Sequence, residues 1–512
     1  MNIREAKEEI TRSVEVYLEK NEDGEYQIPT VKQRPIFMMG APGIGKTAVM
    51  EQIASELDIA LVSYSMTHHT RQSALGLPFI EERQFGGEKA MVSEYTMSEI
   101  IASVYKVMEE SGKKEGILFL DEINCVSETL APAMLLFLQY KIFGNRKLPE
   151  GWVVVTAGNP PQYNKSVKEF DVATLDRLKC LTVEEDFGVW KSYAYQNGIH
   201  AAVVTFLEIN PDWFYAIRTT VEGTQYVTAR GWEDLSRIIS VYEKKKFKVD
   251  KRLVQQYITN SEVAAKFSIY YDLFQKYQSS YQVEDILKGI SGQELQKRAA
   301  GAGFDERVSL LGLILENLNR KFAGTVSREA VLERVVKILR QLKKVAAAME
   351  QGEGARLGDQ KVSLAQSLRQ HCLEVREERD DREAAGSLSP RLRKEYREVL
   401  ALLDQYTEEC DRDGEAGKLF RGVKKKFDAV VKKHHGQVQE AKQALENVFS
   451  FMERVWGQGQ EMILFVTELT ANADSMHFIE MWGSDAYFQY NQELLVGDVR
   501  RNLQREIAEL GI

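Results

Sequence analysis

The stretch Gly40-Ala-Pro-Gly-Ile-Gly-Lys-Thr47 matches the pattern G-x-x-x-x-G-K-[ST], which is typical of a loop that binds phosphate groups. Its glycines carry no Cβ, so the backbone can fold tightly enough for its N–H groups to point at phosphate oxygens. Lys46 adds a positive charge for the β- and γ-phosphates, and the Thr47 hydroxyl suits Mg²⁺. The predicted nucleotide-binding residues are Gly40, Ala41, Pro42, Gly43, Ile44, Gly45, Lys46, Thr47 and Ala48.

The residues on either side of this loop predict a strand before it and a helix after it. Pro35-Ile-Phe-Met-Met39 is a short apolar run that suits a buried strand, and residues 48–57 are helix-forming. A helix beginning at the loop would direct the positive end of its dipole at the bound phosphates. With this context, an accidental glycine-rich turn is the weaker interpretation.

A second informative run, Ile117-Leu-Phe-Leu-Asp-Glu122, has four apolar residues followed by two carboxylates. It predicts a buried strand that brings both carboxylates to its C-terminal end, where parallel α/β sheets bind ligands. Asp121 suits the coordination shell of Mg²⁺, and Glu122 suits a base that polarises the attacking water. The plainer alternative is an ordinary turn at a strand end, which acidic residues also favour.

Two further polar candidates follow predicted elements. Asn159 comes after the apolar run Val153-Val-Val-Thr-Ala157 and could hold the γ-phosphate or the lytic water, although an Asn in such a turn often has no further role. Arg177 lies at the end of a short predicted helix, where the helix dipole alone favours an arginine. Alternating strands and helices up to about residue 184 predict an open parallel sheet with helices on both faces.

Beyond this region the patterns are mainly helical. Residues 187–280 predict a smaller helical domain in which Arg230 begins a helix. Apolar residues then repeat at helical spacing in 331–345, 392–406 and 438–455, which favours a packed bundle over a long coiled coil. We therefore divide the chain into an α/β nucleotide-binding core, a helical lid and a helical C-terminal region. The predicted boundaries are 1–185, 186–285 and 286–512.

Three further polar segments are interpreted from their local patterns. Residues 79–92 predict an inserted β-hairpin around a Gly86-Gly87 turn. Residues 376–389 carry a charge run, which we interpret as an exposed loop or a solvated helix end. Lys424-Lys-Lys426 and Lys432-Lys-His-His435 could form a basic patch, but interleaved apolar residues favour the solvated face of an amphipathic helix.

Composition limits the class of protein. The 512 residues, of which 44% are hydrophobic and 28% charged, suit a globular protein of about three or four domains. A net charge of −9 argues against a dedicated nucleic-acid binder but leaves room for local basic patches. The chain shows no apolar run approaching 18 residues, no signal-peptide pattern and no metal-like cysteine spacing. We expect a cytoplasmic protein without a membrane span.

The order of these features resembles the AAA+ ATPases, and finer motifs resemble the MoxR group of the helix-2-insert clade. The resemblance covers about residues 30–275 and implies a P-loop NTPase αβα sandwich followed by a helical lid. The motifs that carry it are Gly76-Leu-Pro78, Ile117-Leu-Phe-Leu-Asp-Glu-Ile-Asn124, Leu148-Pro-Glu-Gly-Trp152, Ala157-Gly-Asn-Pro160, Thr174-Leu-Asp-Arg-Leu178 and Ala229-Arg-Gly-Trp-Glu233.

The resemblance also implies roles for single residues. Asn159 matches the sensor 1 position, Arg177 the arginine finger that acts on the neighbouring subunit, and Arg230 the sensor 2 arginine. Arg146, just past another predicted helix, competes with Arg177 for the contact in trans. The group usually has Pro before its lid arginine and a small polar residue after it, whereas this chain has Ala229 and Gly231.

The function implied by the resemblance is a ring, expected to hold six subunits, that hydrolyses ATP with Mg²⁺ as its cofactor. Such a ring would remodel or activate a protein partner, typically one with a von Willebrand factor A domain, or insert a metal or cofactor. Two alternatives stay open: a nucleic-acid motor or restriction-type NTPase, and a nucleotide-gated scaffold that assembles without turnover. The acidic balance disfavours nucleic acid as a partner, and Glu122 disfavours the scaffold. The phosphate motif itself does not distinguish ATP from GTP.

Overall fold

The computed structural model describes the chain except for residues 69, 86–87, 145, 164–166, 221–222, 351–355, 358–359, 362, 412–413 and 493–512. The chain forms two compact units. The first comprises Met1–Val189 and Leu373–Tyr396, and the second comprises Trp190–Cys372 and Arg397–Ile512. The three-part division made from the sequence stays a prediction.

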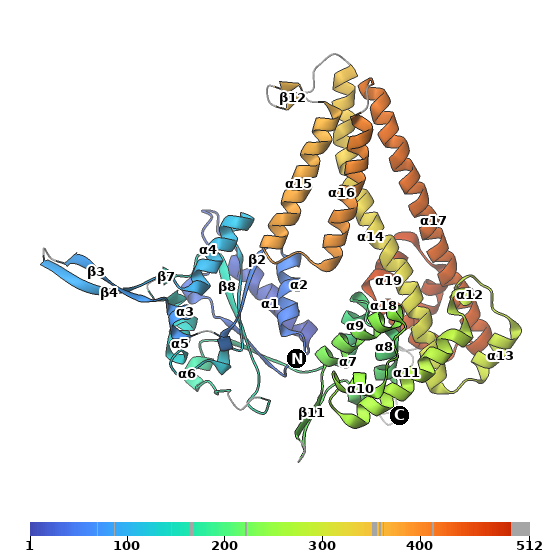
Figure 1. The fold of residues 1–512 in the computed structure, drawn as a ribbon, viewed down its shortest axis with the longest axis horizontal. Coiled ribbons are helices and arrows are strands. Elements are labelled where there is room, and N and C mark those ends of the chain that lie inside the picture. Colours follow the sequence, from blue (N-terminus) through green and yellow to red (C-terminus); the bar gives the residue numbers. More distant parts are fainter. Residues whose placement is uncertain are drawn as a thin grey trace, which may run out of the picture. The chain divides into compact units, whose positions relative to one another are not determined.

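A five-stranded parallel sheet lies at the centre of the first unit, in the order β2-β5-β8-β1-β9 (Figure 1). This confirms the predicted parallel sheet. The strands are β1 (Ile36–Gly40), β2 (Ala60–Ser65), β5 (Gly116–Asp121), β8 (Trp152–Gly158) and β9 (Lys179–Val183). Because these strands are parallel, the C-terminal ends of β2, β5, β8 and β1, which are neighbours in that order, lie along the same edge of the sheet.

A helix predicted over residues 48–57 is present as α2 (Lys46–Glu56). The other α-helices that lie wholly within this unit are α1 (Ile3–Leu18), α3 (Arg71–Leu75), α4 (Glu99–Ser111), α5 (Ala131–Tyr140) and α6 (Val172–Leu175). Helix α1 begins with a capping box: the Asn2 side chain accepts from the Glu5 N–H, and the Glu5 carboxylate accepts from the Asn2 N–H. Every residue of β5 up to Leu120 is buried, as expected for a strand covered on both faces.

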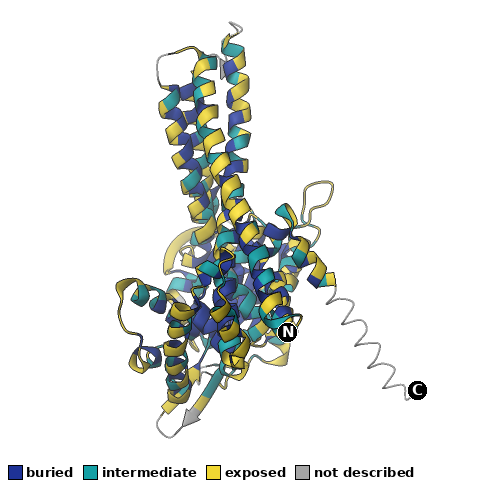
Figure 2. Ribbon diagram, turned by 90° about the vertical axis from the view of Figure 1, so that its right-hand side faces the viewer, coloured by how far each residue is buried: buried dark blue, intermediate teal, exposed yellow. Residues whose placement is uncertain are grey.

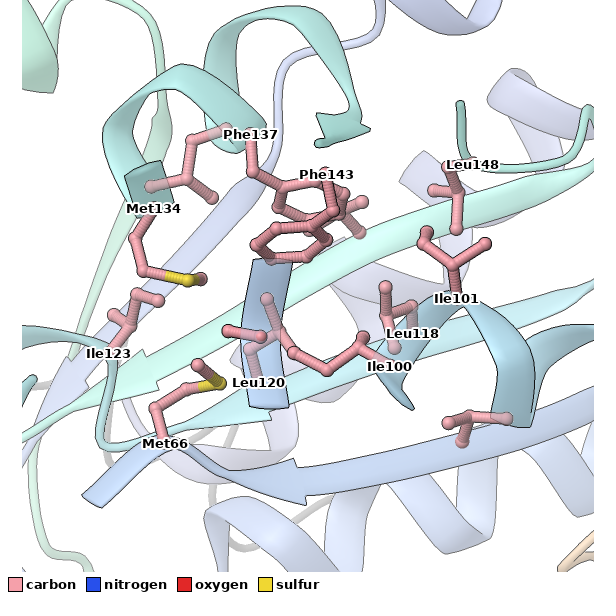
Figure 3. Packing of buried hydrophobic residues seen from close by; sticks show 14 of the residues in the cluster. Met66, Ile100, Ile101, Leu118, Leu120, Ile123, Met134, Phe137, Phe143 and Leu148 are labelled. Carbon is pink, nitrogen blue, oxygen red and sulfur yellow. The ribbon is translucent and has the colours of Figure 1, made fainter. Parts of the chain in front are cut away.

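One face of the sheet packs against an apolar cluster formed with α4, α5 and the short strand β6 (Ile142–Phe143) (Figure 3). Leu118 and Leu120 of β5 point to this same face because side chains alternate along a strand. Above them the rings of Phe137 and Phe143 stack with their centroids 4.0 Å apart. This packing fixes the position of β5, and therefore of the carboxylates that follow it.

A buried lysine follows α5 at the edge of this cluster. Lys141 is 3% exposed, and its ammonium donates to the carbonyl oxygen of Leu138 at 2.8 Å. Burial lowers the pKa of Lys141 from 10.5 to about 7. The folded state therefore binds this proton less tightly than the unfolded chain does. The buried lysine lowers the free energy of unfolding by its full amount below about pH 7, and this destabilisation decreases as the pH rises toward 10.5.

We expect Lys141→Met to stabilise the protein in a pH-dependent way. At pH 6.5 the gain in unfolding free energy should exceed the gain at pH 10 by on the order of 2 kcal/mol, because the wild-type lysine is charged in both states only at the lower pH. Urea unfolding at both pH values measures the difference. The matched control is Lys147→Met, which changes an exposed lysine nearby. A gain that is equal at the two pH values would contradict the prediction.

The predicted insertion is confirmed as a hairpin of β3 (Pro78–Phe85) and β4 (Glu88–Tyr95) (Figure 1). Its predicted turn, Gly86-Gly87, lies outside the described residues. A second, very short hairpin pairs β6 with β7 (Arg146–Lys147). Arg146 thus belongs to a strand of this small hairpin.

The charge run at 376–389 was predicted to be exposed, and this is wrong for its C-terminal part. Most of the run lies in α15 (Leu364–Ala384), but the residues that follow contact the sheet. Ala385 is fully buried and accepts a hydrogen bond from the Leu61 N–H of the edge strand β2 at 2.9 Å. Arg382 pairs with Asp58 at 3.3 Å. An edge strand offers unpaired backbone groups, and this segment satisfies one of them.

The second unit is mainly helical. Its first part comprises α7 (Phe187–Gln196), which starts in the first unit, α8 (Ala201–Ile209), α9 (Ala229–Lys245), α10 (Lys251–Gln255) and α11 (Ser261–Tyr281). Strands were predicted to become rare from residue 187 onward, and no helix was predicted between 208 and 230. The structure has a pair of strands there, β10 (Ala216–Thr220) and β11 (Gly223–Val227), in which β-branched and aromatic residues alternate with others.

Further helices follow those of the predicted lid. They are α12 (Val283–Leu287), α13 (Gln293–Gly301), α14 (Phe304–Glu350), α16 (Pro390–Cys410), α17 (Ala416–Trp456), α18 (Gln460–Ala471) and α19 (Ala473–Trp482). A two-stranded pair, β12 (Arg356–Leu357) and β13 (Gln360–Lys361), interrupts them. Helix α14 packs directly on α8 and α11, and its Gly312 lies so close to Thr205 of α8 that a Cβ would clash. The buried Tyr270 hydroxyl joins Thr205 and Ser309 at 2.7 and 2.8 Å, which ties α8, α11 and α14 together.

Candidate functional site

The loop before α2 has the backbone that phosphate binding requires. Gly43 and Gly45 have φ values of +79° and +95°, a conformation that other residues rarely adopt. A Cβ at Gly40 would lie 2.7 Å from the Val183 carbonyl oxygen, so the loop also needs glycine where it leaves β1. The helix begins directly after Gly45, and its free N–H groups and dipole therefore face the loop.

Lys46 joins the loop to the end of β8. Its ammonium is buried and donates to the carbonyl oxygens of Gly40 and Ala41 at 2.7 and 2.9 Å. It also donates to the Asn159 side-chain oxygen at 2.9 Å. These three acceptors are neutral oxygens, and they hold the ammonium beside the phosphate-binding loop. The two residues come from positions 113 apart in the sequence and meet because β1 and β8 are neighbours.

Thr47 meets the first carboxylate of the β5 end. Its hydroxyl donates to Asp121 Oδ2 at 3.2 Å, and the other carboxylate oxygen accepts the Glu122 N–H at 2.9 Å. A hydroxyl beside a carboxylate is a donor set that suits Mg²⁺, which usually takes one or two protein ligands and completes its shell with water and phosphate. Among the described residues no group of three or more His, Cys, Asp and Glu side chains could hold a metal alone. The Thr47 hydroxyl and the Asp121 carboxylate fit a Mg²⁺ ion whose remaining ligands are water and phosphate oxygens.

Glu122 is held by two hydroxyl groups that the sequence analysis missed. Its Oε2 accepts from Ser65 Oγ at 3.1 Å and from Thr67 Oγ1 at 3.0 Å. Glu122 itself has a φ of +56°, which turns the chain sharply after β5. Ser65 is the last residue of β2 and pairs in register with Asp121. Ser65 is a polar residue at the C-terminal end of a parallel strand, and this position was the signal in the sequence that could have predicted its contact with Glu122.

Removing both hydroxyls should raise basal hydrolysis. Both hydroxyls donate to the same oxygen, Glu122 Oε2, and so occupy lone pairs that the attacking water could otherwise use. We expect Ser65→Ala/Thr67→Ala to increase phosphate release several-fold with ATP affinity unchanged, measured by steady-state turnover and nucleotide titration. Ser63→Ala, at an exposed position two residues earlier on β2, is the control. A fall in turnover would instead mean that the hydroxyls hold Glu122 in its working position.

Asn124 supports the Asn159 backbone and was also missed as a contributor. Its side-chain amide donates to the Asn159 carbonyl oxygen at 2.9 Å. A Cβ at Gly158 would lie 2.6 Å from the Asn124 side-chain oxygen, which explains the glycine before Asn159. The pair of asparagines thus links the turn after β5 with the turn after β8, next to Lys46.

Two of the three arginine candidates belong to the same unit as this cluster and do not join it. Arg177 is exposed and donates to the Ala173 carbonyl oxygen at 2.7 Å, the bond expected of an arginine at a helix C-terminus. Arg146 is exposed on β7. Within the described part of the first unit, neither of them is bonded to residues 40–48, Asp121 or Glu122. The third candidate, Arg230, is exposed in the first turn of α9, in the second unit.

The lid arginine has an unusual neighbour for a structural reason. A Cβ at Gly231 would lie 2.8 Å from the Tyr257 carbonyl oxygen, and the Gly231 N–H donates to the capping Thr228 hydroxyl at 3.1 Å. The start of α9 therefore packs tightly against the residues after α10. This packing accounts for glycine at position 231.

The comparison with known families agrees with this geometry. Residues 36–165 match the model of a family described as the ATPase family associated with various cellular activities (AAA). This segment of the chain is similar to an AAA ATPase domain. It begins at β1 and extends past the end of β8, so it contains Lys46, Thr47, Asp121, Glu122 and Asn159. Among curated proteins, none matches this chain.

The match supports a P-loop ATPase in general and nucleotide binding in particular. AAA domains commonly assemble into rings. Throughout the described ranges, helices that combine the length and apolar character needed to cross a bilayer are absent.

Proposed function

We propose that this protein is a Mg-ATP-dependent ring ATPase of the MoxR type that couples hydrolysis to the remodelling or activation of a protein partner, or to metal or cofactor insertion. The observation that carries the proposal is the meeting of Lys46, Thr47, Asp121, Glu122 and Asn159 at one edge of the sheet. The β3–β4 insertion and the motifs around it support the MoxR assignment.

The proposed roles follow from the chemistry of each side chain. Lys46 and the loop N–H groups bind the β- and γ-phosphates, and Asn159 orients the γ-phosphate or the water. Thr47 and Asp121 hold Mg²⁺, which neutralises phosphate charge when it is bound. Glu122 accepts a proton from the attacking water. Phosphate release from ATP by the purified chain, abolished by EDTA, tests the activity.

We further propose that Arg177 reaches the nucleotide of a neighbouring subunit. Its guanidinium is exposed, and charge that develops on the transferred phosphoryl group needs a nearby cation. Arg230 is proposed to complete the site from the lid.

Arg177→Ala should reduce hydrolysis roughly 100-fold while ATP binding persists, since arginine fingers contribute that much or more. Mixing this variant with Lys46→Ala should restore part of the activity, because the second variant still carries an intact Arg177 for its neighbour. Mixing Arg146→Ala with Lys46→Ala in the same way discriminates between Arg177 and Arg146 as the arginine that acts on the neighbouring subunit. If Arg177→Ala alone keeps wild-type turnover, Arg177 is not the finger.

Assembly is tested by light scattering on Glu122→Gln with and without ATP. A particle of about six subunits in ATP supports the proposed ring. A particle that stays monomeric in ATP is the result that refutes self-assembly. The proposed partner class is a protein with a von Willebrand factor A domain, and a chain found to turn over ATP without forming a stable complex with any such protein would argue against it.

A further inference from the structure

Two helices of the second unit carry positive charge in stretches almost free of acidic residues. In α14, residues 334–349 contain five basic side chains and no acidic one. In α17, residues 418–435 contain seven lysines and arginines and a single acidic residue, Asp428. This concentration occurs in a chain whose net charge is −9. We call these two stretches together the basic arm.

The two stretches lie side by side. The helices α14 and α17 run antiparallel (Figure 1), and two contacts bracket the basic arm. At one end His434 Nε2 lies 2.6 Å from Glu329 Oε2, and at the other Gly417 packs so closely on Glu350 that a Cβ would clash. The basic residues of one helix therefore run alongside those of the other.

Ten of the twelve lysines and arginines of the basic arm are exposed to solvent. Val335, Leu339 and Leu342 of α14 and Val423 and Val438 of α17 are buried, so the opposite face of each helix is exposed (Figure 2). The exposed basic residues are Lys337, Arg340, Lys343, Lys344, Lys418, Arg421, Lys424, Lys425, Lys432 and Lys433. Within the described ranges, Lys426 pairs with Glu409 and Lys418 with Glu415.

A solvated helix face does not account for this pattern. A solvated helix face needs only polar residues, and their charges can have either sign. Residues 376–383 of α15 are an example, because they mix positive and negative charges. In the basic arm like charges lie three or four residues apart, as at Lys337, Arg340 and Lys344, which destabilises a helix. The uniform sign therefore has a cost to folding that a polyanionic ligand would offset.

We propose that the basic arm binds duplex nucleic acid through its phosphate backbone. The arm displays no exposed large hydrophobic side chain, whereas protein interfaces gather aromatic and apolar residues and are poor in lysine. Amphipathic helices that insert into membranes need exposed apolar residues, and single-strand sites need exposed aromatic rings for stacking. Backbone phosphates need only cations.

The dimensions of the arm suit this ligand. At a rise of about 1.5 Å per residue, the terminal cations of the α17 stretch, Lys418 and Lys433, lie roughly 22 Å apart along the helix, and those of the α14 stretch lie about 15 Å apart. A duplex carries one negative charge per roughly 1.7 Å of axis, so either stretch faces several phosphates. Contacts of this kind carry no base sequence information, and binding is independent of sequence.

Fluorescence anisotropy with a labelled 30-base-pair DNA duplex of mixed sequence tests the proposal on the full chain without nucleotide. We expect micromolar binding at 50 mM NaCl that weakens at least tenfold at 200 mM. Lys424→Glu/Lys425→Glu/Lys432→Glu should weaken it at least tenfold and flatten the salt dependence. So should Lys337→Glu/Lys343→Glu/Lys344→Glu on the other helix.

The control Lys251→Glu/Lys276→Glu/Lys297→Glu makes the same change of charge at exposed lysines of the same unit and should alter the affinity less than twofold. All three variants should keep the wild-type circular dichroism and ATP turnover, because none changes the segment that is similar to an AAA ATPase domain. Duplex affinity that is equal in the arm variants and the control overturns the proposal. So does tighter binding to phosphatidylserine vesicles than to the duplex, which would identify a membrane surface instead.

Discussion

Glu122→Gln is expected to slow ATP hydrolysis at least about 100-fold while ATP still binds, because general bases contribute factors of this size. The amide cannot take a proton from water, but it has nearly the same shape. It can still accept hydrogen bonds from Ser65 and Thr67, which lie 3.1 and 3.0 Å from the wild-type carboxylate. Lys46, Thr47 and Asp121 are unchanged, so the phosphate and Mg²⁺ contacts persist. Turnover of ATP and the affinity for a fluorescent ATP analogue measure the two effects separately.

The matched control for this variant is Glu109→Gln, which makes the same chemical change on the exposed face of α4. It should leave both turnover and affinity at the parent values. If Glu122→Gln hydrolysed ATP at the parent rate, Glu122 would not be the base. Ser65 and Thr67 would then surround a carboxylate with a purely structural role.

Lys46→Ala should weaken ATP binding at least about 100-fold, since charge-assisted hydrogen bonds to phosphate contribute roughly 1.5 to 3 kcal/mol each. The ammonium is buried at the loop, 2.7 and 2.9 Å from two carbonyl oxygens and 2.9 Å from the Asn159 side chain. No other lysine or arginine among the residues 40–48 can replace its charge. Isothermal titration with ATP and Mg²⁺ gives the affinity directly.

Thermal unfolding separates this loss from a loss of structure. Lys46→Ala also leaves the carbonyl oxygens of Gly40 and Ala41 without their lysine partner, so the melting temperature of the variant is measured alongside its affinity. Lys32→Ala, at an exposed position before β1, serves as the control. ATP binding that stays tight in a folded Lys46→Ala protein contradicts the assigned role.

Local patterns predicted the elements that carry the nucleotide site. The runs around β1, β5 and β8 are apolar over their whole length because each strand is covered on both faces, and this signal is readable without a structure. The glycines at 43 and 45 occupy positions with positive φ, which few other residues tolerate. The parts of the nucleotide site that depend on one short segment of the sequence could therefore be predicted.

Contacts between distant segments were not predictable in the same way. Ser65 and Thr67 reach Glu122 only because β2 lies beside β5, and Asn124 reaches Asn159 only because β5 lies beside β8. Residues near 385 were expected to be exposed because their neighbours are charged. They are buried because the edge of β2 offers them backbone groups and Asp58 offers Arg382 an ion pair.

The basic arm also combines a local feature that the sequence predicts with a contact between distant segments that only the structure shows. The sequence by itself determined that α17 is amphipathic and that lysines occupy its polar face, because spacing along one helix is a local property. Only the tertiary structure decided that the acid-free stretch of α14 runs beside it, since the two stretches are about 80 residues apart and come together through antiparallel packing. Charge density on a surface depends on neighbours in space, and the linear order of residues does not contain it.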